Sequence, residues 1–409
     1  MAHISIDELR DCCGCTACVS KCIKRCITME CDSEGFYYPV IDEEKCVNCG
    51  ACIKVCQQKK YDNVTALNAI EYYAAFANDN NIRKTSSSGG VFQLIAEKTI
   101  DNKGVVYGVQ MSDDCYACEY VRISEKNALH RIRGSKYIQA YTNDVYNMVK
   151  KDLENNTSVL FSGTPCICNG LHLFLGGKYE HLTILDCICH GVPSQKIWSM
   201  YLKREERIVG SKAINVSFRS KVISWSYFSL STLFGNNHST FQSFKCNPYM
   251  QLMLDNISLR PSCYSCSAKG NNRYADITLG DFWGIDDIIP KLNTHGYGVS
   301  AVICNTKKGA QCFNDIKDRI TFQIVRKEDI TKYNSCLEES VIEPDQRHAF
   351  FYDIDTLDIN EVIKKYVHVS NRTKAAVVLE KYGILNIIRK IRGGYRIVNP
   401  AYGLYITYK

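Results

Sequence analysis

Two cysteine runs near the N-terminus have a spacing that suits iron–sulfur chemistry. Each follows the pattern C-x2-C-x2-C-x3-C; the first comprises Cys12, Cys15, Cys18 and Cys22, and the second comprises Cys46, Cys49, Cys52 and Cys56. Where a chain carries two such runs, the fourth cysteine of each run ligates the cluster held by the other run. The spacing therefore predicts two 4Fe-4S clusters, one on the first three cysteines of the first run with Cys56, and one on the first three of the second run with Cys22.

A zinc site and a set of structural thiols are the alternatives for these runs. Structural zinc usually takes two separated pairs of ligands, and two identical runs of four fit that pattern poorly. Over residues 8–60 the module resembles bacterial two-cluster ferredoxins, although Ile23 and Gln57 stand where those proteins usually have proline. Three further cysteines lie outside both runs and are expected to have no ligand role: Cys13, Cys26 and Cys31.

Four more cysteines fall where an α/β sheet would bring them together. Cys166 follows the expected strand SVLFSG, Cys189 follows LTILDC, and a C-x2-C pair supplies Cys263 and Cys266. Open α/β sheets bind ligands in loops at the carboxyl ends of their strands, and a helix N-terminus there favours an anionic group. This placement predicts a third 4Fe-4S cluster. The alternative is that each cysteine is a small buried core residue, which is common.

The elements that would position these cysteines alternate along the chain after a connector at 61–85. Segments rich in β-branched and aromatic residues predict strands at 104–111, 158–163, 182–187, 213–218, 227–234, 275–282 and 298–305. Apolar residues at helical spacing predict helices at 89–100, 144–156, 195–209 and 307–320. Strands that alternate with helices imply an α/β domain with a mixed sheet.

Several short motifs occur in the order found in one family of redox proteins. They are KTSSSGGVF (84–92), RGSKYIQA (133–140), SGTPC (162–166), CHGVPS (189–194), RPSCYSC (260–266) and YADITLGDFWGI (274–285). Over about residues 70–335 the chain resembles the β-subunit family of coenzyme F-420 (deazaflavin) hydrogenases and dehydrogenases. The resemblance implies iron–sulfur clusters, a flavin that is FAD rather than FMN, and electron transfer, with the deazaflavin coenzyme as one candidate substrate.

With this resemblance, we expect an α+β or α/β chain in three parts. A small ferredoxin-like domain with two 4Fe-4S clusters would span 1–62. A larger mixed-sheet α/β domain that binds the flavin and the third cluster would span 63–340. A basic, partly helical extension would span 341–409, with an amphipathic helix at 377–392.

The residues expected to hold the flavin come from two loops and a turn. Hydroxyl and free N–H groups at a helix start suit a phosphate or the polar edge of a flavin ring, although serine-rich helix caps are common without a ligand. Cations in the second loop would pair with the flavin phosphates or form a solvated charged loop. The residues are Ser86, Ser87, Ser88, Gly89 and Gly90 in the first loop, Arg133, Ser135, Lys136 and Tyr137 in the second, and Thr164 at the turn.

Three residues are candidates for catalysis. His190 could protonate a reduced substrate near neutral pH, or only hydrogen-bond its own loop. Lys269 could offset the charge of a cluster or substrate, or lie at the surface. Asp281 could shape the wall of a flavin or substrate pocket with the aromatic Phe282 and Trp283, or those two residues could belong to the core.

Positive charge is concentrated in the C-terminal tail. Residues 361–409 hold ten Lys and Arg against two acidic residues, so the tail carries +8 and the rest of the chain −1. A nucleic-acid partner is not expected, because its basic residues should line the main fold. The tail could dock a ferredoxin, another electron-transfer protein or a membrane surface, or be a solvated helix face. The 23 cysteines, without a signal-peptide pattern or a membrane-spanning apolar run, indicate a cytoplasmic chain.

Together these observations predict an iron–sulfur flavoprotein oxidoreductase. We expect it to pass electrons between ferredoxin-type clusters and an FAD that exchanges hydride with a small organic substrate. It would act either as a ferredoxin-dependent reductase or as a dehydrogenase of reduced deazaflavin. The alternative is a non-catalytic relay subunit that passes electrons to a partner enzyme and binds no substrate.

Overall fold

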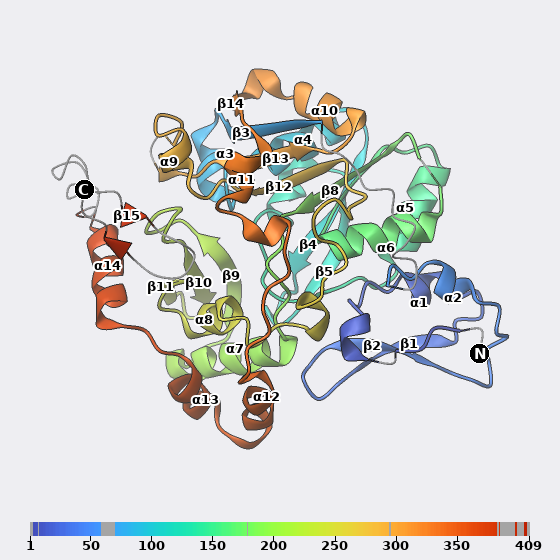
Figure 1. The fold of residues 1–409 in the computed structure, drawn as a ribbon, viewed down its shortest axis with the longest axis horizontal. Coiled ribbons are helices and arrows are strands. Elements are labelled where there is room, and N and C mark those ends of the chain that lie inside the picture. The colour runs from blue at the N-terminus through green and yellow to red at the C-terminus, as the bar shows by residue number, and fades with distance from the viewer. Residues whose placement is uncertain are drawn as a thin grey trace.

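The centre of the molecule is a mixed sheet of nine strands in the order β14-β3-β13-β12-β8-β7-β4-β5-β6 (Figure 1). The computed structural model describes residues 3–6, 8–58, 70–177, 179–293, 296–382, 384, 397–398 and 405–406. Four neighbouring strands, β4, β7, β8 and β12, run parallel, and the flanking pairs include antiparallel ones, so the expected mixed α/β sheet is confirmed. The strands are β3 (Glu71–Ala77), β4 (Val105–Met111), β5 (Cys118–Ile123), β6 (Ala140–Tyr141), β7 (Val159–Ser162), β8 (Leu182–Cys187), β12 (Ile277–Asp281), β13 (Ser300–Cys304) and β14 (Ile320–Ile324).

Helices cover both faces of this sheet, and the period of two along each strand decides which side chains meet them. In β4, Val106 packs in the same core as α4 (Val91–Asp101) and α10 (Lys307–Asn314). Its neighbours Val105 and Tyr107 pack in the core that holds α5 (Val145–Glu154) and α6 (Pro165–Leu175). Because these strands are buried on both faces, they form continuous apolar runs in the sequence.

A second sheet of three antiparallel strands, β9 (Ala213–Ser220), β10 (Ser229–Phe234) and β11 (Ser239–Ser243), shares an aromatic core with four helices. Trp198 is fully buried there, with Phe218 and Tyr249 at ring-centroid distances of 4.8 and 4.9 Å. Part of the expected C-terminal extension therefore lies in the main core. The four helices are α7 (Gln195–Val209), α8 (Pro248–Leu254), α12 (Arg347–Thr356) and α13 (Ile359–Tyr366).

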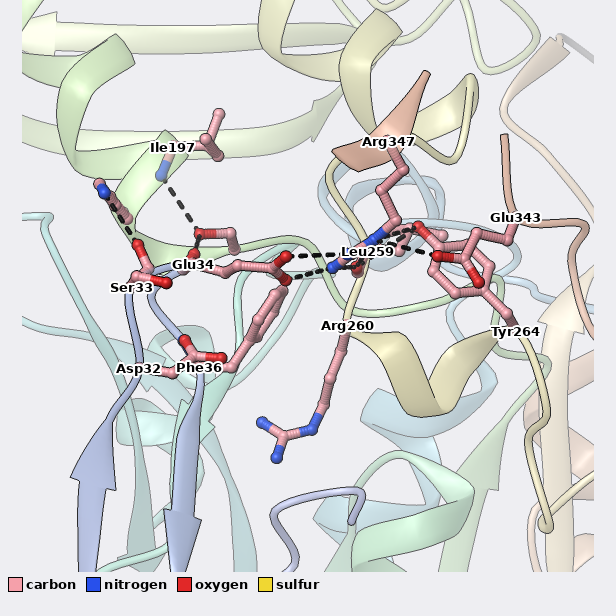
Figure 2. A network of polar contacts seen from close by, with 12 residues as sticks. Asp32, Ser33, Glu34, Phe36, Ile197, Leu259, Arg260, Tyr264, Glu343 and Arg347 are labelled. Carbon is pink, nitrogen blue, oxygen red and sulfur yellow. Dashed lines mark hydrogen bonds and ion pairs between the residues drawn. The ribbon is translucent and has the colours of Figure 1, made fainter. Parts of the chain in front are cut away.

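The N-terminal module contains α1 (Ala17–Lys21), β1 (Ile27–Cys31), β2 (Tyr37–Ile41) and α2 (Ala51–Lys54). The turn between β1 and β2 carries Phe36, which is fully buried in the aromatic core next to Phe351 of α12. Beside it, Glu34 forms an ion pair with buried Arg347, as Figure 2 shows. The module is therefore fixed to the larger fold by both packing and charge.

The remaining elements include two departures from the sequence-based expectations. β3 is a strand of the large sheet, although its residues lie in the segment expected to be a connector. Residues 377–381 of the expected helix at 377–392 belong to α14, and most of the rest lies outside the described residues. Among the described residues, no helix is long and apolar enough to cross a membrane. The further elements are α3 (Asn80–Thr85), α9 (Ile285–Ile288), α11 (Lys327–Thr331), α14 (Asn371–Lys381), β15 (Ile397–Val398) and β16 (Tyr405–Ile406).

Candidate redox site

The first three cysteines of the first run and the last cysteine of the second run lie around one pocket, which is called the first pocket below. The pKa of Cys18 is raised well above its usual value, mainly by burial and then by the three other thiols of the set. The backbone N–H of Gly14 donates a hydrogen bond to Cys12 Sγ over 3.4 Å. N–H donors to cysteine sulfur suit an anionic iron–sulfur cluster. The structure thus brings together the residues that the spacing assigned to one cluster. They are Cys12, Cys15, Cys18 and Cys56.

The second cysteine set is partly drawn together. Cys22 Sγ lies 3.3 Å from Cys26 Sγ. A hydrogen bond with Cys22, burial and the charge of Cys46 raise the pKa of Cys26. Cys52 belongs to the same small core and accepts a backbone N–H hydrogen bond over 3.2 Å, whereas Cys49 is exposed. Cys26, which was expected to have no ligand role, therefore lies among these thiols.

The third cysteine set converges from three separate segments around the cysteine pocket, whose thiols are Cys166, Cys189, Cys263 and Cys266. Thr164 is the N-cap of α6, so Cys166 lies in the first turn of that helix. The pKa of Cys263 is raised, mainly by burial and then by the other three thiols. Its Sγ accepts a hydrogen bond from a backbone N–H over 3.4 Å. The thiols and the N–H donor fit an iron–sulfur cluster. Within the described ranges, no group of three or more metal-ligating side chains is arranged for a single ion.

Two side chains connect the first pocket to the cysteine pocket. Gln57 donates from Nε2 to Cys13 Sγ over 3.1 Å and to the carbonyl oxygen of Cys166 over 2.8 Å. Cys13 lines both pockets. A hydrogen bond with Cys13 holds the pKa of Cys166 below its usual value, and the charge of Arg260 acts in the same direction. No sequence pattern indicated that Cys13 or Gln57 would bridge two cysteine sets.

Arg260 fills the junction between these two pockets. Only 1% of the residue is exposed. Its guanidinium donates to the carbonyl oxygens of Cys12 and Tyr37 over 2.8 and 2.9 Å, and to Oε1 of Gln139 over 2.9 Å. The ring centroid of Tyr38 lies 4.3 Å away. Because Arg260 also lines the cysteine pocket, one positive charge is buried between the first and third cysteine sets.

The two loops assigned to the flavin lie against each other. Ser87 Oγ accepts a hydrogen bond from the backbone N–H of Ser135 over 2.8 Å. Arg219 of β9 donates to the Ser87 carbonyl over 3.2 Å, to the Tyr137 hydroxyl over 3.2 Å and to the Asp281 carboxylate over 2.8 Å. Its buried Nε has no hydrogen-bond partner among the described residues. Both loops therefore meet at one arginine with a spare donor, which fits an anionic or carbonyl group of a bound flavin.

The rest of the first loop is committed to internal contacts. The hydroxyls of Ser86 and Ser88 both donate to backbone carbonyl oxygens of the chain. A side chain at Gly89 would come within 2.4 Å of the Ala75 carbonyl oxygen. Gly90, the N-cap of α4, has φ +90°, in the left-handed region that favours glycine. All four residues therefore shape the loop, and the hydroxyls of Ser86 and Ser88 are used in contacts within the chain.

Lys136 of the second loop is turned toward the backbone of its own loop. Lys136 Nζ donates to the carbonyl oxygens of Arg131 and Arg133 over 3.2 and 3.0 Å. Burial lowers the pKa of Lys136 to about 8. Burial also lowers the pKa of Arg133. Lys136 therefore closes its own loop.

The residues that meet at Arg219, which are Ser87, Tyr137 and Asp281, form the Arg219 site. This site and the cysteine pocket are neighbours along one edge of the large sheet. β8 and β12 pair in parallel, with Cys187 opposite Leu279. Asp281 is the last residue of β12, and Cys189 lies two residues beyond the end of β8. Neighbouring strands lie about 4.8 Å apart. Both residues lie at the carboxyl ends of parallel strands, where open α/β sheets bind ligands.

The three catalytic candidates divide between these two places. His190 and Lys269 line the cysteine pocket. Lys269 Nζ donates to the carbonyl oxygens of Cys189 and Cys336, each over 2.7 Å, so it ties two loops of this pocket together. His190 Nδ1 lies 3.5 Å from Cys336 Sγ, and burial lowers the pKa of His190.

Asp281 lies at the Arg219 site and is already engaged. Its Oδ1 accepts hydrogen bonds from Arg219 and from Nε1 of Trp225, the latter over 2.7 Å. Trp225 stacks on Trp283 with ring centroids 4.9 Å apart. This carboxylate therefore holds Arg219 in position beside an aromatic wall. Arg219 and Trp225 were not among the site residues that the sequence indicated.

Comparisons with known proteins give matches for both the N-terminal module and the larger fold. Within the family described as coenzyme F420 hydrogenase/dehydrogenase, residues 72–146 match the model of the N-terminal part of the beta subunit, and residues 156–330 match the model of its C-terminal part. Residues 39–59 match a 4Fe-4S binding domain. A search of curated proteins gives no match. A chain of the xenon-derivatized F420-reducing NiFe hydrogenase complex from Methanosarcina barkeri is similar, with 11% identity and a TM-score of 0.45, over 80% of this chain and 95% of that chain. The two beta-subunit matches together span more than half of the sequence, and the chain belongs to the coenzyme F420 hydrogenase/dehydrogenase beta-subunit family, with a 4Fe-4S domain at its N-terminus.

Proposed function

We propose that this chain is an iron–sulfur flavoprotein oxidoreductase that exchanges electrons between a one-electron carrier protein and a small organic substrate. Family membership and the 4Fe-4S match give electron transfer as the class of function. One observation carries the finer proposal: the cysteine pocket and the Arg219 site lie side by side at the carboxyl edge of the sheet. A group that carries single electrons and a group that carries electron pairs would then be neighbours.

Each cofactor has a set of residues that would hold it. The three cysteine sets would each ligate one 4Fe-4S cluster, and Arg219, Ser87, Ser135 and Tyr137 would contact FAD. When bound, the clusters supply one-electron transfer and the flavin supplies hydride exchange with an organic substrate, for which the deazaflavin coenzyme is a candidate. The protein's own contribution is to exclude water from the buried sets, to place Arg260 between two of them, and to fix Arg219 through Asp281.

A relay subunit without a substrate of its own is the second candidate, and one observation favours it. The hydroxyls of Ser86 and Ser88 and the carboxylate of Asp281 already have partners within the chain. In a relay these contacts would be structural only, and a partner enzyme would carry out the two-electron chemistry.

Two variants test the assignments separately. Cys263→Ser with Cys266→Ser should lose about four of about twelve irons per chain and keep the signals of the two N-terminal clusters. Arg219→Met should lose bound flavin and keep all the iron. Cys31→Ser, at an exposed thiol outside every set, is the matched control and should change neither quantity. A wild-type chain that carries about twelve irons but no flavin would favour the relay, and a double variant with undiminished iron would refute the third cluster.

A further inference from the structure

The thiol of Cys13 lies between the first and third cysteine sets, since Cys13 lines both of their pockets. Hydrogen bonds with Cys15 of the first set and with Cys166 of the third set raise the pKa of Cys13 well above its usual value. The two sets pack closely, because a Cβ added at Gly170 of α6 would lie 3.0 Å from Cys15 Sγ. A free thiol is protonated at neutral pH. Cys13 therefore offers one S–H proton to a ligand sulfur of either set.

Gln57 holds this thiol in place. The residue is 4% exposed, and its Nε2 donates to Cys13 Sγ over 3.1 Å and to the Cys166 carbonyl oxygen over 2.8 Å. The second contact fixes the orientation of the amide, because a flipped amide would turn its oxygen toward a carbonyl oxygen. Since Cys13 Sγ accepts this N–H, the proton of Cys13 is left for a neighbouring sulfur.

Folding alone does not account for a glutamine at this position. Oε1 of Gln57 is buried and has no hydrogen-bond partner among the described residues. A buried polar atom without a partner lowers the stability of the fold. Two-cluster ferredoxins usually have proline after the fourth cysteine of a run, and proline has no side-chain donor. What glutamine adds here is a donor to the thiol between the two sets.

The second cysteine set does not share this thiol. Within the described part of the chain, Cys22, Cys46 and Cys52 pack in a small core of which Cys13 is not a member, and they line neither of the two pockets. A cluster at the second set therefore serves as an internal reference, since its reduction potential should not depend on Cys13.

We propose that the Cys13 thiol, held by Gln57, is a shared hydrogen-bond donor that sets the reduction potentials of the first and third clusters together. This inference rests on the proposed function, since it takes both clusters as present. Hydrogen bonds to the sulfurs raise the potential of a cluster, because reduction makes the cluster more negative. The step affected is the gain of one electron by either cluster; no bond forms or breaks, and Cys13 keeps its proton. Gln57 acts through Cys13 and is a positioning residue.

The test measures the potential of each cluster in the anaerobically purified, loaded protein, by redox titration followed by electron paramagnetic resonance. Iron and acid-labile sulfide are assayed on the same samples. Cys13→Ala removes the donor, Cys13→Ser replaces it by a hydroxyl, and Gln57→Leu removes the contact that orients it. The matched controls are Cys31→Ala, at an exposed thiol, and Gln323→Leu, at an exposed position of β14.

Cys13→Ala should lower the equilibrium constants for reduction of the first and third clusters about tenfold each, which for one electron is about 59 mV. Gln57→Leu should lower both constants by a smaller factor, and Cys13→Ser should lie between Cys13→Ala and the wild type. The second cluster in every variant, and all clusters in the two controls, should change less than about twofold, or about 18 mV. Every variant should keep the iron content of the wild type.

Unchanged potentials in Cys13→Ala, or a shift in only one of the two clusters, would overturn the inference while the proposed function stands. A loss of about four irons in Cys13→Ala would also overturn it, because Cys13 would then be a cluster ligand. A wild-type protein without the iron of the third cluster would instead refute the proposed function, and the inference with it.

Discussion

Replacing Arg260 by glutamine should weaken the junction between the N-terminal module and the larger fold. The guanidinium donates two hydrogen bonds into the module, to the carbonyl oxygens of Cys12 and Tyr37. A hydrogen bond to a charged group contributes about 1.5–3 kcal/mol. Two such hydrogen bonds contribute roughly 3–6 kcal/mol to the free energy of unfolding. The net loss in Arg260→Gln is smaller, because the variant no longer buries a charge. We therefore expect the module of Arg260→Gln to become susceptible to proteolysis at urea concentrations that leave the wild type intact.

The same substitution should lower two reduction potentials. At an effective dielectric constant of about 20 and a separation of about 7 Å, a unit charge contributes about 2.4 kcal/mol. For one electron this corresponds to about 100 mV, because a tenfold change in the equilibrium constant equals 59 mV. A positive charge favours the reduced, more negative form of a cluster. Its loss should therefore lower the reduction potentials of the clusters proposed at the first and third cysteine sets. The second set, which is farther from Arg260, should shift less.

Arg260→Lys is the matched control, because it keeps the charge and loses the fork of donors. Lysine should preserve the potentials while weakening the junction. The assay is a redox titration monitored by electron paramagnetic resonance, with limited proteolysis on the same samples. If Arg260→Gln shifted neither the first nor the third potential by more than about 20 mV while the module stayed docked, the electrostatic reasoning would be refuted.

Three further predictions concern contacts that hold the site together. Glu34→Gln leaves the buried charge of Arg347 uncompensated and should lower the free energy of unfolding by about 3–5 kcal/mol. Glu343→Gln is the control, because Glu343 is half-exposed and lies 4.0 Å from Arg347; it should lower that free energy by less than about 1 kcal/mol. Both values are measured by urea unfolding. Burial lowers the pKa of Lys221 to about 7. Between about pH 7 and 10.5 the side chain of Lys221 is therefore protonated in the unfolded chain but not in the folded one, and the free energy of unfolding should rise with pH across that window. Lys221→Met should flatten this rise. Gly89→Ala places a methyl group 2.4 Å from the Ala75 carbonyl oxygen and should lower the free energy of unfolding by about 1–3 kcal/mol and release flavin. Gly177→Ala is the control, because no atom lies within 4 Å of the added methyl group, and it should change neither quantity. Equal melting temperatures of the two variants would contradict the close approach at Gly89.

Local sequence patterns predicted five of the nine strands of the large sheet, namely β4, β7, β8, β12 and β13. The spacing also named the four thiols that the structure brings around the first pocket. Strands and helices with a clear period, such as β8 and α7, lie where their apolar residues indicated. The short chain between Cys12, Cys15 and Cys18 keeps these three thiols close together, and the crossover rule for two such runs added Cys56 to them. For the third set, Cys166 and Cys189 were chosen because each follows an expected strand, and Cys263 and Cys266 because of their C-x2-C spacing.

Residues whose partners lie far away in the sequence could not be predicted. Arg260 lies within the motif RPSCYSC, but its hydrogen bond to Cys12 spans 248 residues, and a single arginine before proline carries no local signal. Arg219 is likewise one basic residue in an ordinary strand, and only the fold places it beside Asp281. β3 was missed because its alanines have low strand propensity, although burial on both faces of a sheet accommodates them.

The central claim, three iron–sulfur clusters beside a flavin, is tested most directly by the cofactor content of the anaerobically purified chain. Iron and acid-labile sulfide would be assayed together with released flavin, identified by chromatography. The account predicts about twelve irons, as many sulfides and one FAD per chain. About eight irons and no flavin would contradict it, because the cysteine pocket and the Arg219 site would then hold neither of the groups assigned to them.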